Sequence, residues 1–323
     1  MRIPVVVIFA PTASGKTALA IKLFGKSSLS CFKGRAELIS ADSMQVYKGL
    51  DIGTAKPDPA EKSELAHHLV DVFNPDSQFS VADFVSMADR CCSEIYSRGK
   101  IPLVAGGTGF YIRNFILGLP ETPVSNEKIR NQLKERLKKE GNESLYAELS
   151  AVDPESALKI NVNDGYRICR ALEVFYSTGK KRSSFKVSAE MRELYDFKVL
   201  VLETERAALY EKINLRVVKM FENGLEKEVR SLYASGFGKS SPGMQAIGYR
   251  EWFFEDGTLR SDSDNVLREI QRDSRKYAKK QYTFMADIPG AVKIDASDEE
   301  KMFIEVQKNL RPVFFKKNSF CVY

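Results

Sequence analysis

A short loop near the N-terminus constrains the fold more than any other feature of this chain. Residues 10–17 read Ala-Pro-Thr-Ala-Ser-Gly-Lys-Thr, and they follow directly on the apolar run Ile3 to Phe9. A strand that leads into a small-residue loop and then into a helix is the arrangement of a P-loop, in which backbone N–H groups and the positive end of the helix face phosphates. The sequence therefore predicts an α/β core that binds a chain of phosphates.

The residue types in the loop agree with this interpretation. Lys16 supplies a full positive charge, and Thr17 can place its hydroxyl on a phosphate-bound Mg²⁺. The first position, usually glycine, is Ala10, which can form the turn if its φ stays negative. A chance match is a poor alternative, because a β-branched strand precedes the loop and a helical pattern over residues 16–24 follows it.

Length and composition bound the class of protein. The chain has 323 residues, which predicts one large domain or two, and 43% hydrophobic residues suffice for a full core. No apolar stretch approaches the roughly 18–20 residues that span a bilayer. The N-terminus begins almost at once with a strand rather than with a signal segment. We expect a cytoplasmic protein that does not enter a membrane.

Cysteine and histidine usage indicates neither a disulfide framework nor a zinc site. The cysteines are odd in number and irregularly spaced: Cys31, Cys91, Cys92, Cys169 and Cys321. The two histidines, His67 and His68, are adjacent and would face opposite sides of a strand. We expect structural roles for both histidines.

Strands and helices alternate along the first part of the chain. The predicted strands are residues 4–10, 36–41, 68–72 and 101–105, and the predicted helices are residues 16–24, 80–98 and 108–117. This alternation predicts a mostly parallel sheet flanked by helices, as in P-loop NTPases. The Ser-rich stretch Lys26 to Lys33 is expected to be a mobile loop, and the tail after Pro312 is expected to fray.

A helical segment interrupts the alternation. From Asn126 to about Gly179 the pattern is helical throughout, with high charge density and no strand candidate. The later predicted elements are strands at 197–202 and 291–294 and helices at about 205–222, 224–234, 263–286 and 298–309. The predicted organisation is a first core segment, a small all-helical insertion domain and a second core segment, at residues 1–121, 122–190 and 191–323.

A carboxylate follows the second predicted strand, in the run Ser40-Ala41-Asp42-Ser43. Ligands of an open parallel sheet bind outside the carboxyl ends of its strands, so Asp42 would lie close to the bound phosphates. Asp42 could bind Mg²⁺, act as a general base or only form a turn. Beside cations it would stay ionised, which makes it a weak base that suits an acceptor whose proton becomes acidic during the reaction.

The fourth predicted strand ends in Gly106-Gly107-Thr108. An ordinary P-loop ATPase would have an aspartate here that holds Mg²⁺ through water. Glycines let a ligand approach the backbone, and Thr108 can donate one hydrogen bond unless it only caps the next helix. The missing carboxylate weakens an ATPase interpretation and leaves Asp42 as the free carboxylate of the predicted site.

Cations recur on one face of the long predicted helix, at Arg268, Arg272, Arg275 and Lys279. Together with a net charge of +6, this basic stripe is compatible with a nucleic-acid partner. A solvated helix face that pairs with its own carboxylates is the alternative. Nearby aromatic residues could stack on unpaired bases, although most are expected in the core. They are Tyr166, Tyr249, Trp252, Tyr277, Tyr282 and Phe284.

Together, these motifs resemble those of one family. They occur in the order Ala10–Thr17, Asp42–Gln45, Tyr47–Pro57, Gly106–Thr108, Asn161–Glu173 and Met244–Tyr249. Over about residues 1–310 the chain resembles the bacterial tRNA dimethylallyltransferases, also called tRNA isopentenyltransferases. The resemblance implies transfer of a dimethylallyl group from dimethylallyl diphosphate to N6 of adenosine 37, in the anticodon loop of tRNA, with release of diphosphate.

The resemblance also implies roles for individual residues. The cradle of the diphosphate would be Thr12, Ala13, Ser14, Gly15, Lys16 and Thr17. Asp42 would take the N6 proton, and Thr108 would position the base. Lys16, Mg²⁺ and Arg216 would assist the departure of diphosphate. By sequence alone, an ion pair of Arg216 with Glu211 or Glu222 is the favoured alternative.

The resemblance and the basic stripe together predict the tRNA contacts. They are Asp42, Ser43, Met44, Gln45, Thr108, Arg130, Tyr166, Arg167, Arg170, Gln245, Arg272 and Arg275. The chain departs from the family pattern at Ala10 and at the end of the long helix, where Phe284 and Ala286 replace the usual Trp and Arg. The expected protein is a monomer with tRNA and dimethylallyl diphosphate as substrates and Mg²⁺ as cofactor.

Two other classes share the P-loop and the parallel sheet. A small-molecule or nucleotide kinase would leave the Gly106–Thr108 and Met244–Tyr249 segments without a role. An RNA-binding NTPase switch would need a guanine-reading Asn-Lys-x-Asp motif, which the sequence lacks. Transfer to tRNA is therefore the preferred interpretation, and the kinase is the main alternative.

Overall fold

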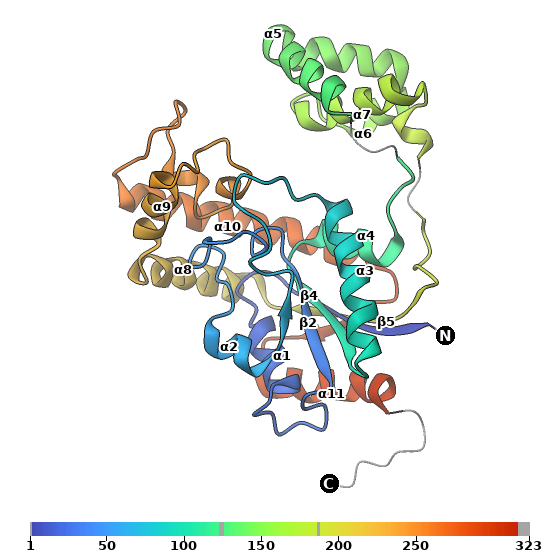
Figure 1. Ribbon diagram of the computed structural model, residues 1–323, viewed down its shortest axis with the longest axis vertical. Coiled ribbons are helices and arrows are strands. Elements are labelled where there is room, and N and C mark those ends of the chain that lie inside the picture. The colour runs from blue at the N-terminus through green and yellow to red at the C-terminus, as the bar shows by residue number, and fades with distance from the viewer. Residues whose placement is uncertain (1, 123–125, 186–187, 316–323) are drawn as a thin grey trace. The chain divides into compact units, whose positions relative to one another are not determined.

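The computed structural model describes residues 2–122, 126–185 and 188–315 (Figure 1). The chain divides into two compact units. The first comprises Met1–Ile116 and Arg192–Tyr323, and the second is Leu117–Met191. The sequence predicted residues 122–190 for the insertion domain. The first unit contains the sheet, and the second unit is helical in its described residues.

The sheet of the first unit has the strand order β3-β2-β4-β1-β5-β6, and every pairing is parallel. The strands are β1 (Ile3–Phe9), β2 (Ala36–Ala41), β3 (His67–His68), β4 (Ile101–Gly106), β5 (Tyr195–Glu203) and β6 (Val292–Asp295). Phe9 and Ala41 both pair with Gly106, so the strands β1, β2 and β4 end at one level. The predicted α/β core with a parallel sheet is confirmed.

Helices cover both faces of this sheet. Those of the first unit are α1 (Lys16–Phe24), α2 (Pro59–Glu64), α3 (Val81–Ser97), α4 (Gly109–Leu117), α8 (Arg206–Glu222), α9 (Leu225–Ala234), α10 (Ser263–Ala286) and α11 (Glu299–Phe314). α1 and α11 share one core cluster with the strands, through residues such as Leu23, Val306 and Ile8. On the other side, Phe84 of α3 and Phe115 of α4 pack edge to face, and Phe115 reaches Tyr195 of β5.

The structure differs from the predicted elements in three main places. The third strand, expected at 68–72, is only the pair His67–His68, because Leu69 and Asp71 adopt left-handed φ values of 62° and 59° that break the ladder. The helix α2 was missed, although Asp58 and Glu61 form a capping box at its start. The last helix continues through Pro312 to Phe314 rather than ending at 309. The chain beyond residue 315 lies outside the described part.

The stretch Lys26 to Lys33, expected to be a mobile loop, is tied to the core. Ser28 and Ser30 both donate side-chain hydrogen bonds to backbone oxygens at the end of α1. The ring of Phe32 is fully buried and lies against Phe24. A loop with a buried aromatic anchor has a fixed conformation, so the polar composition of this segment was a poor guide.

The second unit is built from α5 (Glu127–Val152), α6 (Pro154–Lys159) and α7 (Gly165–Thr178). α5 breaks at Gly141, whose φ of 80° is left-handed. The small core of this unit contains Leu133 and Leu149 of α5 and Leu172 of α7. The prediction of an all-helical segment is confirmed for the residues described. Across both units, no described helix is both long enough and apolar enough to cross a membrane.

Candidate active site

The loop Ala10–Thr17 connects β1 to α1 and bends through two left-handed residues. Ala13 has a φ of 62° and Gly15 a φ of 78°. The strained alanine marks a backbone that its surroundings hold in place. Ala10 is buried, and its φ is negative, as the sequence required. Its N–H donates to the Gly106 oxygen at 3.3 Å. The substitution of the usual glycine by Ala10 is therefore compatible with the turn.

A glutamine from the distant helix α10 holds this loop against the end of β4. Gln281 accepts the backbone N–H of Thr12 at Oε1, 3.1 Å away. Its Nε2 donates to the Gly107 oxygen at 2.7 Å. The side chain is 2% exposed. Gln281 thus fixes the distance between the P-loop and the glycine pair, a role that the sequence did not predict.

Asp42 follows β2 and closes a turn with one of its oxygens. Oδ1 accepts the backbone N–H groups of Met44 at 2.9 Å and Gln45 at 3.2 Å. Within the described residues, Oδ2 accepts no hydrogen bond from the protein. The carboxylate therefore forms the turn, as one alternative held, and still has a free oxygen for chemistry.

Thr108 lies between the turn that carries Asp42 and helix α10. Its Oγ1 accepts the backbone N–H of Ser43 at 3.1 Å, and its own N–H donates to the Ala41 oxygen at 3.1 Å. The hydroxyl also lies near Tyr277 of α10 and acts to lower the pKa of that phenol. Burial, with the added effect of Asp42, raises the pKa of Tyr277 to about 12. Thr108 is therefore more than a helix cap.

Two cations and one carboxylate share the centre of the site. Burial and the neighbouring Arg216 lower the pKa of Lys16 to about 8, against the opposing effect of Asp42. Arg216, on α8, donates to the backbone oxygen of Thr54 at 3.4 Å. Among the described residues, no ion pair joins Arg216 to Glu211 or Glu222, and the carboxylate that acts on the pKa of Arg216 is Asp42. Arg216 therefore points into the site, and the positive charge there exceeds the negative charge.

Asp42 lines two cavities. The small cavity, of about 20 Å³, is lined by Lys16, Thr17, Leu38, Ser40, Asp42, Gln45, Pro57, His67, Ala105 and Gly106. The large cavity, of about 240 Å³, is lined by polar and apolar residues. Its wall comprises Thr12, Asp42, Ser43, Met44, Gly53, Thr54, Ile213, Arg216, Val217, Met220, Gln245, Ala246, Ile247, Arg250, Ile270, Ser274 and Tyr277. One carboxylate thus faces both the small cavity at the P-loop and the large, partly apolar cavity.

The segment Asp51–Pro57 forms part of this wall and is anchored from α9. Glu228 accepts the consecutive backbone N–H groups of Asp51, Ile52 and Gly53, at 2.8–3.3 Å. The hydroxyl of Tyr249 donates to Glu228 at 2.6 Å and accepts the N–H of Gly53 at 3.1 Å. The anchored loop presents the carbonyl oxygens of Thr54 and Ala55, which bind Arg216 and Gln45.

The remaining predicted contacts of the first unit divide into two groups. Ser43, Met44 and Gln245 line the large cavity. Arg272 is exposed and donates to Asp273 at 2.9 Å. Arg275 hydrogen-bonds to the side chain of Asn214 on α8, so part of its role is to hold α10 against α8. The site and the basic stripe thus use different residues of α10.

Four of the residues predicted to contact tRNA lie in the second unit. Arg130 and Arg170 both pair with the buried Glu173, at 3.7 Å and 3.0 Å. Arg167 pairs with Asp164 at 3.4 Å, and Tyr166 is 77% exposed. These residues provide charged and aromatic groups on the helix α7 and the start of α5.

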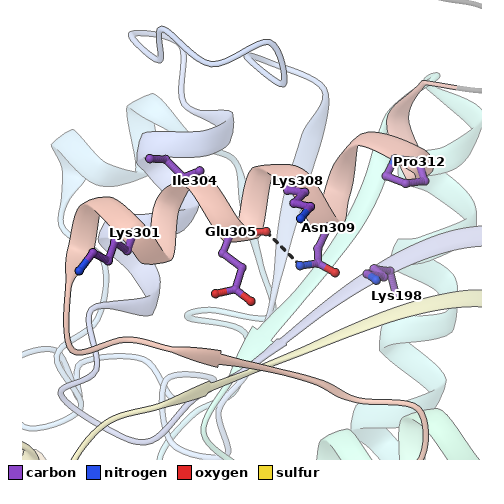
Figure 2. A pocket seen from close by; sticks show the side chains of 7 residues that line it. All are labelled: Lys198, Lys301, Ile304, Glu305, Lys308, Asn309 and Pro312. Carbon is purple, nitrogen blue, oxygen red and sulfur yellow. Dashed lines mark hydrogen bonds between the residues drawn. The ribbon is translucent and has the colours of Figure 1, made fainter.

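Two further observations concern residues outside this centre. Phe284, which replaces the usual tryptophan, packs against Gly109, where an added Cβ would come within 2.5 Å of it. A larger hollow runs along α11 and β5, lined by Lys198, Lys301, Ile304, Glu305, Lys308, Asn309 and Pro312 (Figure 2). The residues that line it are exposed or half-buried, so it is a solvent-exposed surface hollow.

The described residues contain no group of three or more His, Cys, Asp or Glu side chains that could hold a metal ion. Thr17, the predicted Mg²⁺ contact, lines the small cavity. Cys91, Cys92 and Cys169 are free thiols.

Fold and site together define a P-loop-like α/β enzyme with a partly apolar cavity next to the loop Ala10–Thr17. Residues 45–287 match the sequence model of the IPP transferase family. The tRNA dimethylallyltransferase 2 of Geotalea daltonii is 43% identical over 285 residues, which cover 88% of this chain and 85% of that protein. The tRNA dimethylallyltransferase of Geobacillus thermodenitrificans is 40% identical over 310 residues, 95% of each chain.

Solved structures support the same family. The full-length tRNA isopentenylpyrophosphate transferase from Bacillus halodurans has a TM-score of 0.66 at 34% identity and covers 97% of each chain. A eukaryotic dimethylallyltransferase, described as acting on tRNA, has a TM-score of 0.78 at 27% identity, over 96% of this chain and 78% of that one. The chain therefore belongs to the IPP transferase family, and its enzyme class is that of the tRNA dimethylallyltransferases.

Proposed function

We propose that this enzyme transfers a dimethylallyl group from dimethylallyl diphosphate to N6 of adenosine 37 in the anticodon loop of tRNA. One observation carries the proposal: Asp42 lines both the small cavity at the P-loop and the large, partly apolar cavity. A dimethylallyl group that moves from a diphosphate at the P-loop to an adenine in the large cavity must cross the boundary between the two cavities. The carboxylate at that boundary is then the proton acceptor.

The diphosphate lies along the backbone of Thr12 to Thr17. The small cavity, at about 20 Å³, is too small for it, so the phosphates occupy the mouth of the loop at the N-terminus of α1. Lys16 and Arg216 supply the positive charge that faces the diphosphate. Both cations would stabilise the negative charge that develops on the leaving group.

The large cavity receives the reacting carbon and the adenine. Met44, Ile213 and Val217 give its wall apolar surface for the dimethylallyl chain. Tyr277 and Gln245 give polar groups for the base, and Thr108 holds the backbone of Ser43, which also lines this cavity. The adenine leaves its stack to enter, at a cost of a few kcal/mol that is lowest in a loop.

The chemical step is a substitution at carbon. The N6 amine attacks C1 of the dimethylallyl group, a C–N bond forms, and the C–O bond to diphosphate breaks. The N6 proton goes to the free Oδ2 of Asp42, and the electron pair of the C–O bond leaves with diphosphate. A weak base suffices because the amine becomes acidic only as the C–N bond forms.

Mg²⁺ fits this site as a companion of the substrate. Thr17 would contribute its hydroxyl, and the phosphates and waters would fill the other positions, because Mg²⁺ keeps several waters in such sites. When bound, Mg²⁺ would neutralise charge on the leaving diphosphate.

The proposed tRNA contacts extend from the cavity mouth, Ser43 to Gln45 and Gln245, to Arg272 and Arg275 of α10. Arg130, Tyr166, Arg167 and Arg170 of the second unit complete the set. The proposal also includes a monomeric enzyme, because one copy of this site is enough for one anticodon loop, and a cytoplasmic location.

Incubation with dimethylallyl diphosphate, Mg²⁺ and an anticodon stem-loop with three adjacent adenosines tests the function. Mass spectrometry should show the gain of one C5 unit on the central adenosine. A control RNA with inosine at that position, which lacks the N6 amine, should stay unmodified. Phosphoryl transfer from ATP to a small acceptor, without C5 transfer to RNA, would instead favour the kinase.

A further inference from the structure

The two histidines, both expected to be structural, have different surroundings in β3. Nε2 of His68 lies 2.8 Å from the carboxylate of Glu37, in a cluster of ion pairs. His67 faces the other side and lines the small cavity together with Lys16 and Thr17. Only His67 is thus placed next to the P-loop.

One ring nitrogen of His67 has a partner and the other has none. Nδ1 lies 2.7 Å from the backbone oxygen of Leu65, so it carries a proton and donates it. Nε2 is buried and has no hydrogen-bond partner among the described residues. Burial, assisted by the nearby positive charges of Lys62 and His68, lowers the pKa of His67. The imidazole therefore presents an unused acceptor at Nε2, and a buried polar group that stays unpaired destabilises the fold.

The small cavity has the size and polarity to hold one water molecule. Its volume is about 20 Å³, and one water needs roughly 10–15 Å³ together with two to four polar partners. Thr17, Ser40 and Asp42 contribute polar groups to the same wall as His67. A water in this position can donate to His67 Nε2 and keep a lone pair for a cation.

We propose that His67 is a positioning residue whose Nε2 accepts a hydrogen bond from one water in the small cavity, and that this water belongs to the hydration shell of the Mg²⁺ that arrives with diphosphate. This inference rests on the proposed function. Groups that hydrogen-bond to metal ligands orient those ligands, and their loss typically lowers metal affinity by about 10–100-fold. His67 thereby holds the hydrated cation next to the Thr17 hydroxyl.

Titration calorimetry of inorganic diphosphate over a series of Mg²⁺ concentrations tests this role without turnover. His67→Leu removes the acceptor, whereas His67→Gln places an amide oxygen near the position of Nε2. The leucine variant should bind Mg²⁺-diphosphate about tenfold more weakly or worse, and the glutamine variant should recover most of this loss. Binding of diphosphate without Mg²⁺ should be equal in all forms. His68→Gln is the matched control and should keep the wild-type Mg²⁺ dependence.

A second measurement uses the wild-type protein. The chain has two histidines, so NMR of isotope-labelled ring nitrogens is simple to assign. Nε2 of His67 should be an unprotonated acceptor at neutral pH and should shift when Mg²⁺ and diphosphate are added together. A protonated Nε2 would overturn the proposal, and so would wild-type Mg²⁺ dependence in His67→Leu or equal losses in the leucine and glutamine variants. If the wild type still transfers the C5 unit, only the role of His67 fails. If it does not, the proposed function itself fails.

Discussion

The side chain of Thr108 accepts the backbone N–H of Ser43 at 3.1 Å. This one bond connects the loop after β4 to the turn after β2. Asp42 lies in that turn, between Ala41 and Ser43, so the bond helps to set the position of its carboxylate. The neighbouring bond from the Thr108 N–H to the Ala41 oxygen, also 3.1 Å, completes the connection. The geometry of the proposed base thus depends on residues that are adjacent in the sheet but far apart along the chain.

Asp42 has two functions that a pair of variants can separate. Asp42→Asn keeps an oxygen for the N–H groups of Met44 and Gln45 and removes the base, whereas Asp42→Ala removes both. We expect kcat to fall about 10²–10⁴-fold in the asparagine variant, the range for a general base. Diphosphate and RNA binding should remain near wild type. Near-normal turnover by Asp42→Asn would reduce Asp42 to a turn-forming residue.

The lowered pKa of Lys16 predicts a pH dependence of diphosphate binding. A bound polyanion favours the ammonium form, so binding above pH 8 must include uptake of a proton by Lys16, whose pKa in the free enzyme is about 8. After allowance for the titration of diphosphate itself, the dissociation constant should be flat below this pH and should then rise, by at most about tenfold per pH unit. Calorimetry at a series of pH values measures this.

Lys16→Arg provides the control for this titration, because arginine stays charged over the whole range. Its profile should show only the titration of diphosphate itself. Identical profiles for wild type and Lys16→Arg would exclude Lys16 as the titrating group.

The anchored loop at Asp51–Pro57 predicts a steric effect. A Cβ at Gly53 would lie 2.4 Å from the ring of Tyr249, so Gly53→Ala must displace the loop or the ring. We expect a loss of about 1–3 kcal/mol in the free energy of unfolding, as for other overpacked sites, with a raised KM for RNA. Gly238→Ala is the matched control, since no atom lies within 4 Å of its Cβ position. Equal stability of the two variants, by denaturant titration, would contradict the anchoring role.

Arg272 predicts a salt effect on RNA binding. The side chain is 52% exposed and only pairs with Asp273, so it is available for a phosphate. Arg272→Ala should reduce the slope of log affinity against log salt by about one counterion. Lys301→Ala, on the exposed face of α11, removes the same charge and should leave the slope unchanged. If the Arg272 variant also keeps the wild-type slope, the basic stripe is an ordinary solvated face.

The sequence predicted the parts of the site that local patterns determine. The P-loop lies where strand, loop and helix signals coincide, and Asp42 and Thr108 follow from the rule that parallel strands present ligands at their carboxyl ends. Gln281 could not be found in this way, because its contact with Thr12 joins residues 269 positions apart. The inward orientation of Arg216 depends on the Thr54 carbonyl, which the folded loop presents. The third strand was overestimated because an apolar run does not reveal left-handed residues such as Leu69.

The central claim is that the loop Ala10–Thr17 holds a diphosphate that leaves from carbon, rather than a phosphoryl group that is passed on. Dimethylallyl diphosphate with a heavy oxygen isotope in the bridge between carbon and phosphorus tests it directly. After reaction with the anticodon stem-loop, mass spectrometry should find all of the label in released diphosphate and one C5 unit on the RNA. Label in dimethylallyl alcohol, with phosphate transferred elsewhere, would show P–O cleavage and would contradict the proposed chemistry.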